Sequence, residues 1–122
     1  MQMIITDRMT IEEIMDSLYQ QYGNEFNWSM IPFSNKSFVE ELKRELDPND
    51  AFLSGAVYAV AKCDSNDDVL YLGVDSLDAR GNWRIYHLTY SSDNADGFPQ
   101  YVEFNNRKEA AEYIQNQFVS KF

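Results

Sequence analysis

The 122-residue chain has a single cysteine, a single histidine and no long apolar run. One cysteine, Cys63, excludes an internal disulfide and a metal cage made of several cysteines. One histidine, His87, excludes a metal site with two histidines. No stretch approaches the roughly 18 apolar residues of a membrane-spanning helix, and residues 1–7 lack the features of a signal peptide. We therefore expect a cytoplasmic protein that does not contact a membrane.

The residues that common catalytic devices require are also scarce. The five glycines are isolated from one another, so no glycine-rich loop can cradle a phosphate group. His87 lies in a predicted strand with no hydroxyl or thiol placed beside it, as a Ser-His-Asp or Cys-His arrangement would need. From these absences we predict no cofactor, no catalytic residues and a protein that is not an enzyme.

One short segment partly matches a calcium-binding loop. Asn94, Asp96, Gly97 and Glu103 occupy positions that such a loop uses, but Ser92 stands where the first aspartate belongs. The segments on either side have the alternating pattern of strands rather than helices. We therefore interpret residues 92–97 as a hairpin loop and predict no metal site.

Basic residues are in short supply as well. The chain has twenty acidic residues and ten basic residues, so the net charge is −10. This charge repels nucleic-acid phosphates and anionic membranes, and we expect no direct binding to DNA or RNA. A basic protein is the partner that electrostatics favours, although solubility alone also explains an acidic surface.

What the chain does contain is enough apolar material for one folded domain over residues 1–122. Hydrophobic residues make up 44% of it and aromatic residues 15%. Three segments have helical periodicity and follow capping sequences: residues 11–22 after Thr10, 38–46 after Ser37, and 107–118 after Asn106. Gly23 and Asp47-Pro48 end the first two.

The middle of the chain changes to the two-residue period of strands. Residues 56–62, 69–74, 83–90 and 100–104 are predicted strands joined by short linkers, whereas residues 24–34 are predicted to be an irregular link. The expected fold is α+β in the order α-α-β-β-β-β-α, a four-stranded antiparallel meander with the helices packed on one face. Small residues favour the face of Val57, Ala59 and Ala61 for that contact.

Candidate partner-binding residues come from the two predicted hairpin loops and the irregular link. The loops carry the acidic candidates Asp64, Asp67, Asp68, Asp93 and Asp96. Trp28 is the aromatic candidate, because tryptophan often anchors protein interfaces and loops often carry binding residues. We predict that the acids form an anionic rim and that Trp28 lies on the surface beside it.

The function predicted from these features is a small, acidic, non-catalytic module that binds or inhibits another protein. In size, charge and architecture the chain resembles bacterial toxin-immunity proteins, which implies neutralisation of a basic toxin or nuclease. One alternative is a small ligand-binding or enzymatic domain with a pocket near His87. Another is an inhibitor that mimics nucleic acid. Both a monomer and a homodimer are compatible with the sequence.

Overall fold

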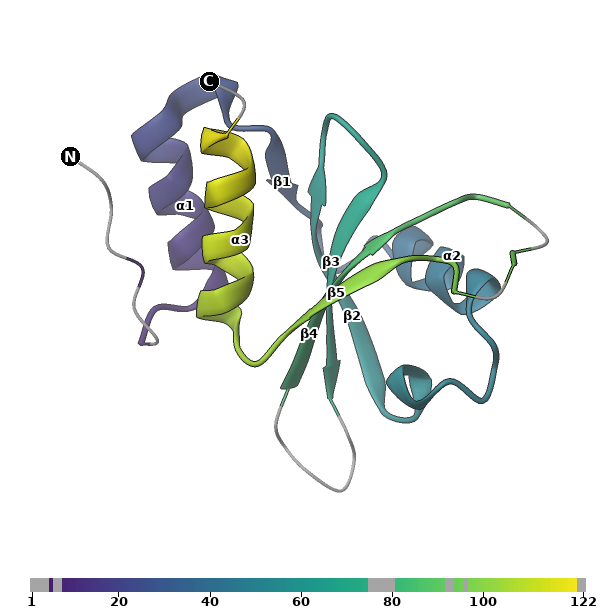
Figure 1. The fold of residues 1–122 in the computed structure, drawn as a ribbon. Coiled ribbons are helices and arrows are strands. Elements are labelled where there is room, and N and C mark those ends of the chain that lie inside the picture. Colours follow the sequence, from purple (N-terminus) through teal and green to yellow (C-terminus); the bar gives the residue numbers. More distant parts are fainter. Residues whose placement is uncertain (1–4, 6–7, 75–80, 92–93, 96, 121–122) are drawn as a thin grey trace.

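A five-stranded antiparallel sheet forms the centre of the protein, and strands that are consecutive in sequence are neighbours in it (Figure 1). The computed structural model describes residues 5, 8–74, 81–91, 94, 95 and 97–120. The strands are β1 (Trp28–Met30), β2 (Ala56–Cys63), β3 (Asp68–Val74), β4 (Gly81–His87) and β5 (Tyr101–Phe104). The helices are α1 (Ile11–Tyr22), α2 (Ser37–Glu45) and α3 (Arg107–Val119), with short 3-10 turns η1 (Gly23–Glu25) and η2 (Ala51–Leu53). The α+β class and the antiparallel meander are confirmed, with five strands in place of the predicted four.

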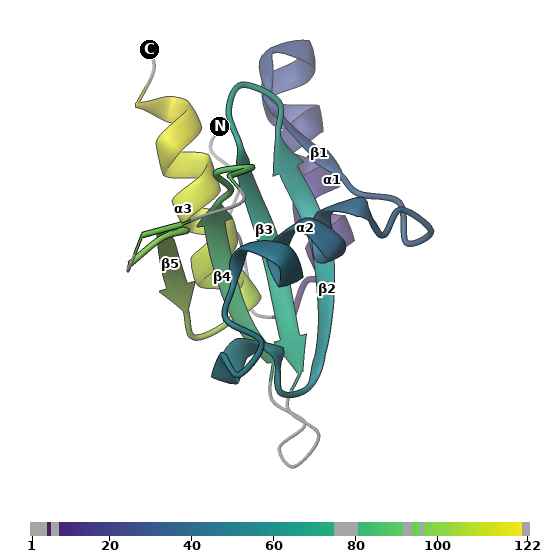
Figure 2. The same ribbon diagram turned by 90° about the vertical axis from the view of Figure 1, so that its right-hand side faces the viewer.

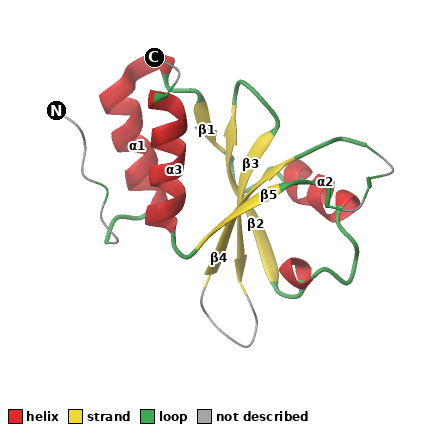
Figure 3. Cartoon of the chain, viewed as in Figure 1, coloured by secondary structure: helices red, strands yellow, loops and turns green. Residues whose placement is uncertain are grey.

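Helices cover both faces of this sheet. Helices α1 and α3 lie side by side on one face, and α2 lies on the other (Figures 1 and 3). The prediction that the helices pack on one face is therefore wrong. Strand β3 shows the reason, since Leu70 joins the core under α1 and α3 while Val69 and Tyr71 join the core under α2. A strand that is apolar on both faces requires cover on both.

A β-bulge in β2 divides the small residues that were expected to share one face. Val57 and Ala59 pack under α2, but the pairing with β3 shifts between Ala59 and Ala61. Ala61 consequently faces α1 and α3, where it is fully buried. An extra residue in one strand reverses the alternation of side chains beyond it, which a strict two-residue period cannot anticipate.

The predicted helix starts agree with the structure at two of three positions. Thr10 and Glu13 form the capping box of α1, and the Asn106 side chain accepts a hydrogen bond from the Glu109 amide at the start of α3. The predicted box at Ser37 is wrong. Ser37 is already inside α2, and its amide and hydroxyl both donate to Asn35 Oδ1. Asn35 therefore supplies, two residues earlier, the accepting side-chain oxygen that was expected from Ser37.

The predicted irregular link contains the first strand of the sheet. Three of its residues, Trp28–Met30, pair antiparallel with the end of β2. The Trp28 side chain is only 4% exposed and belongs to the core under α1 and α3. The Tyr19 hydroxyl on α1 donates to the Trp28 carbonyl, which ties this edge of the sheet to the helical layer. A segment without obvious periodicity is therefore ordered by its neighbours.

Strand β4 ends three residues earlier than predicted, at His87. The amides of Thr89 and Tyr90 donate to the carboxylate of Glu45, at the end of α2, rather than to a strand. Tyr90 has a positive φ of 54°, a conformation that strands do not adopt. Glu45 therefore turns the chain out of the sheet at this point.

Candidate functional site

The two loops that carry the predicted acids belong to the same end of the sheet. Strand β2 ends and β3 begins there, and so do the end of β4 and the start of β5 (Figure 2). The pairing is continuous across it, since Asp68 lies opposite His87 and the His87 amide donates to the Gln100 carbonyl. We call this region, formed by residues 64–68, 87–91, 94, 95 and 97–101, the loop end.

Each described acid of the loop end has a distinct environment. The Asp64 carboxylate accepts a hydrogen bond from Ser29 Oγ at 3.0 Å, and the exposed Asp67 is held through its carbonyl by the Leu88 amide. Lys62 donates to the carbonyls of Cys63 and Asn66, which places a cation within the same hairpin. The hairpin is therefore internally braced, while its two outermost carboxylates still face solvent.

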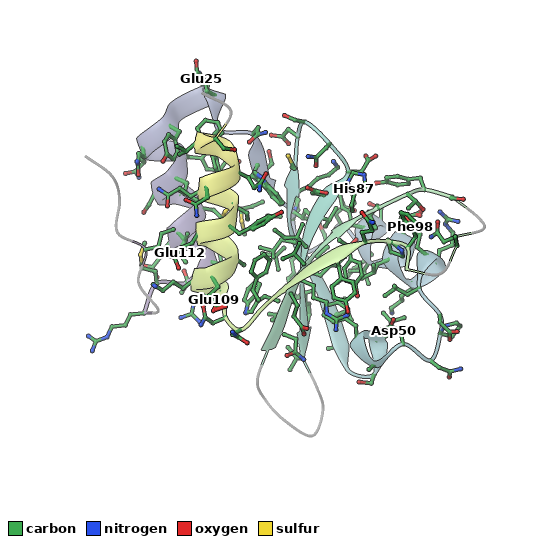
Figure 4. The ribbon with its side chains drawn as sticks, in the orientation of Figure 1. Glu25, Asp50, His87, Phe98, Glu109 and Glu112 are labelled. Carbon is green, nitrogen blue, oxygen red and sulfur yellow. The ribbon has the colours of Figure 1, made fainter. Side chains whose placement is uncertain are left out.

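Asp68 and His87 form a close pair at the centre of the loop end. Asp68 Oδ1 lies 2.7 Å from His87 Nδ1, and the side chains are 27% and 57% exposed. A carboxylate at this distance fixes the orientation of the imidazole and directs the other ring nitrogen elsewhere. His87 closes β4 at its exposed end, rather than lying in the middle of a strand as predicted (Figure 4).

A depression of about 600 Å³ lies beside this pair, between the sheet and α3. Ile85, Val102 and Tyr113 contribute to an apolar wall, and Asp68, His87 and Gln100 line it with polar groups. The described residues that line it include no serine, threonine or cysteine. The depression can therefore hold a side chain or a small molecule.

Exposed aromatic side chains gather at the same end. Tyr90, Phe98 and Tyr101 are each about half exposed, and Val102 is 40% exposed. All four lie on the β4–β5 connection or on β5, and Figure 4 shows Phe98 on the same side of the molecule as His87. Partial burial, followed by the negative charges of Asp67, Glu41 and Glu45, raises the pKa of Tyr90, so it stays a neutral hydrogen-bonding phenol.

One of these aromatic residues is held in place by a stacked cation. The Arg84 guanidinium lies 4.2 Å from the centre of the Tyr101 ring and 4.6 Å from that of Phe52. It also donates to the Tyr86 hydroxyl at 2.7 Å and lies 3.6 Å from a carboxylate oxygen of Glu103. Burial raises the pKa of Tyr86 to about 12, so its hydroxyl remains protonated. Tyr101 is thus a rigid platform despite its exposure.

The structure places the predicted partner-binding residues in different surroundings. Asp64, Asp67 and Asp68 lie together at the loop end, as expected for one hairpin. Asp93 and Asp96 are outside the described residues. The prediction that Trp28 lies on the surface is wrong, because β1 places it between the sheet and the helices α1 and α3.

Sequence reasoning missed the aromatic residues that are exposed at the loop end. Tyr90, Phe98 and Tyr101 lie in or beside a segment rich in Ser, Asp, Asn, Gly and Pro, and such a segment is a signal for an exposed loop. The contact between Asp68 and His87 was also missed. It depends on the register of β3 and β4, which cannot be inferred from two residues that lie 19 positions apart in the sequence.

Comparisons with other proteins leave the site to be interpreted from its own geometry. No protein-family model, curated protein or solved structure matches this chain. Among the described residues, no group of three or more His, Cys, Asp or Glu side chains is arranged to hold a metal ion. In that same part of the chain, every helix is too short or too polar to cross a bilayer.

Proposed function

We propose that the protein is a non-catalytic binding module whose loop end docks onto a basic protein, as an immunity-type inhibitor would. The observation that carries this proposal is the combination of exposed aromatic residues and carboxylates at one end of the sheet. Tyr90, Phe98 and Tyr101 offer the residue types that anchor interfaces, and Asp64 and Asp67 lie on the neighbouring hairpin. The aromatic residues replace Trp28 as the proposed anchors.

The electrostatics of the whole molecule supports a basic partner. A net charge of −10 attracts a cationic surface over a distance of about one Debye length, roughly 8 Å at physiological salt. Such attraction accelerates encounter and selects the orientation of docking more than it adds affinity. The remaining acids of the rim, Asp93 and Asp96, stay part of the proposal on the strength of the sequence.

The proposal is tested by affinity capture from the source cells, followed by binding measurements with the purified partner. The test variant combines Asp64→Asn, Asp67→Asn and Phe98→Ala. We expect a basic protein that the wild type captures and this variant loses, with an association rate that falls steeply as salt is added.

The matched control removes two charges elsewhere. Glu12→Gln and Glu25→Gln lie on α1 and η1, where both side chains are exposed, and Glu25 is far from the loop end in Figure 4. This control should keep partner capture. A partner that the loop-end variant and the control release equally, or captured proteins that are not basic, would argue against the proposal.

A second candidate function rests on the Asp68–His87 pair and its depression. An imidazole oriented by a carboxylate can act as a general base toward water or a substrate hydroxyl, and the adjoining wall is partly apolar. The proposed substrate class is a small uncharged or cationic ester. Hydrolysis of an ester panel that disappears in His87→Ala and falls strongly in Asp68→Asn would establish it, and equal background rates in all three proteins would exclude it.

A further inference from the structure

Strand β5 is an open edge of the sheet beside the loop end. It forms the outer margin of the sheet in Figure 2, and Tyr101, Val102 and Glu103 are all exposed. The opposite edge, β1, is only three residues long and is tied to α1 through Tyr19. The two edges therefore differ, and β5 is the one that presents a row of exposed side chains.

The hydrogen bonding of β4 and β5 shows which backbone groups of β5 face outward. His87 and Gln100 are opposite each other, and the His87 amide donates to the Gln100 carbonyl at 2.9 Å. Because hydrogen-bonded and non-hydrogen-bonded pairs alternate in an antiparallel ladder, Val102 and Phe104 also point their backbone groups at β4. The N–H and C=O groups of Tyr101 and Glu103 consequently point away from the sheet. No described residue of the chain accepts or donates at those groups.

The depression near His87 lies on one side of this edge. Val102 lines it from β5, together with Tyr113 from α3 and Ile85 from β4. A strand added beside β5 would alternate its side chains between the two faces of the sheet, so the one next to Val102 would enter the depression. Added strands obtain affinity from backbone hydrogen bonds and specificity from such pockets for alternate side chains. The edge therefore offers the backbone hydrogen bonds, and the depression offers the pocket for a side chain.

The charges near β5 favour a basic occupant over a second copy of this chain. The Glu103 side chain is half exposed, and Asp68 also lines the depression. The nearby Arg84 is only 15% exposed and lies between two aromatic rings, while Lys108 is paired with Glu112 at 3.3 Å. Two copies would bring two chains of charge −10, and two Glu103 side chains, into contact.

We propose that β5 binds an extended basic segment of the partner protein as a sixth strand. The backbone of that segment pairs with Tyr101 and Glu103, an apolar side chain enters the depression beside Val102, and a lysine or arginine lies opposite Glu103. This inference rests on the proposed function, because it names the part of the partner that the loop end recognises.

The test uses an N-acetylated eight-residue peptide of alternating lysine and valine as the probe. Hydrogen exchange of the wild-type protein, followed residue by residue by NMR, should slow at the Tyr101 and Glu103 amides when the peptide is added. Two control peptides have the same length. One replaces the valines with prolines, which keeps the charge but prevents strand pairing, and the other replaces lysine with glutamate. Both should bind more weakly.

Substitutions at one position separate the backbone contribution from the charge. Glu103→Pro removes an outward N–H without touching the bonds to β4, and we expect about a tenfold loss of peptide affinity. Glu103→Gln keeps that N–H and removes the charge, and we expect about a two- to threefold loss. If Glu103→Pro unfolds, the exchange data on the wild-type protein still decide the question.

The outcomes distinguish this inference from the function on which it rests. Equal binding of the valine and proline peptides, with slowed exchange only outside β5, overturns the sixth-strand proposal and leaves the acidic binding module intact. Failure of every basic peptide to bind at low salt contradicts both. Slowed exchange at Tyr101 and Glu103 without peptide, increasing with protein concentration, shows that a second copy occupies the edge and also overturns the proposal.

Discussion

Glu45 is a buried carboxylate that holds the loop end to α2. Its side chain is 7% exposed and accepts hydrogen bonds from the Thr89 amide and hydroxyl at 2.8 Å and from the Tyr90 amide at 3.1 Å. A buried charge is stable only when its acceptor sites are filled in this way. The position of the exposed Tyr90 therefore depends on a residue that is itself hidden from the surface.

Replacing Glu45 with glutamine should destabilise the protein by about 1–3 kcal/mol. The amide has one acceptor oxygen instead of two, so at least one donor among Thr89 and Tyr90 loses its partner. Urea unfolding measures the effect. Glu40→Gln, on an exposed position of the same helix, is the control and should change stability by less than about 0.5 kcal/mol. Equal losses of stability in the two variants would show that the Glu45 carboxylate does not hold the loop end to α2.

The same pair of proteins should also differ in pH dependence. Burial alone would raise the pKa of Glu45, but the hydrogen bonds that its carboxylate accepts from Thr89 and Tyr90 outweigh it and hold the pKa below the usual 4.5. The ionised carboxylate therefore stabilises the fold fully above pH 4.5, and this contribution is lost as the pH falls through the lowered pKa. The stability difference between wild type and Glu45→Gln should be constant near neutrality and shrink below pH 4.5. A stability difference that grows as the pH falls would contradict a lowered pKa for Glu45.

At the scale of elements, the packing of η2 on β3 depends on a glycine. A Cβ atom added at Gly73 would lie 2.9 Å from Phe52 Cε1, which is closer than carbon atoms approach in folded proteins. Phe52 is 6% exposed and also contacts the Arg84 guanidinium. The absence of a side chain at Gly73 therefore lets the aromatic ring close the core under α2.

We expect Gly73→Ala to destabilise the protein by about 1–3 kcal/mol through overpacking against Phe52. Phe52→Leu shortens the opposing side chain and should relieve the contact. In a double-mutant cycle by urea unfolding, the two changes should therefore be less destabilising together than the sum of each alone, by at least about 0.5 kcal/mol. Strict additivity would show that the alanine acts on the strand itself and not on the ring.

At the scale of the whole molecule, the charge of −10 opposes compactness as well as attracting partners. Several carboxylates are used locally, as in the pairs of Arg44 with Glu41 and Lys108 with Glu112. The ten basic residues cannot neutralise all twenty acidic residues, so an excess of negative charge remains. Salt should consequently screen a net repulsion in the folded protein.

We expect the free energy of unfolding to rise by an amount on the order of 1 kcal/mol between low salt and physiological ionic strength. Sodium chloride and tetramethylammonium chloride should act equally, because screening depends on ionic strength and not on ion identity. The variant with Glu12→Gln and Glu25→Gln should respond less. Stabilisation by sodium but not by tetramethylammonium would indicate a specific cation site and contradict this explanation.

Much of the local structure could be predicted because short-range chemistry decides it. The Thr10–Glu13 and Asn106–Glu109 caps involve residues three apart, and the apolar periods of α1 and α3 are visible within one segment. The same reasoning placed the acidic residues in a hairpin between two strands, and Asp64 and Asp67 are exposed there. Such features need no knowledge of the rest of the fold.

Partners distant in sequence decided the rest. Trp28 is buried because β1 pairs with β2, and Asp68 meets His87 because of the register between β3 and β4. The turn at Tyr90 comes from Glu45, 45 residues earlier. By itself, then, the sequence determined the three helices, four of the five strands with their order, and an acidic surface. Only the tertiary structure decided which face α2 covers and which aromatic side chains remain exposed, because burial depends on what packs against a residue and not on its own chemistry.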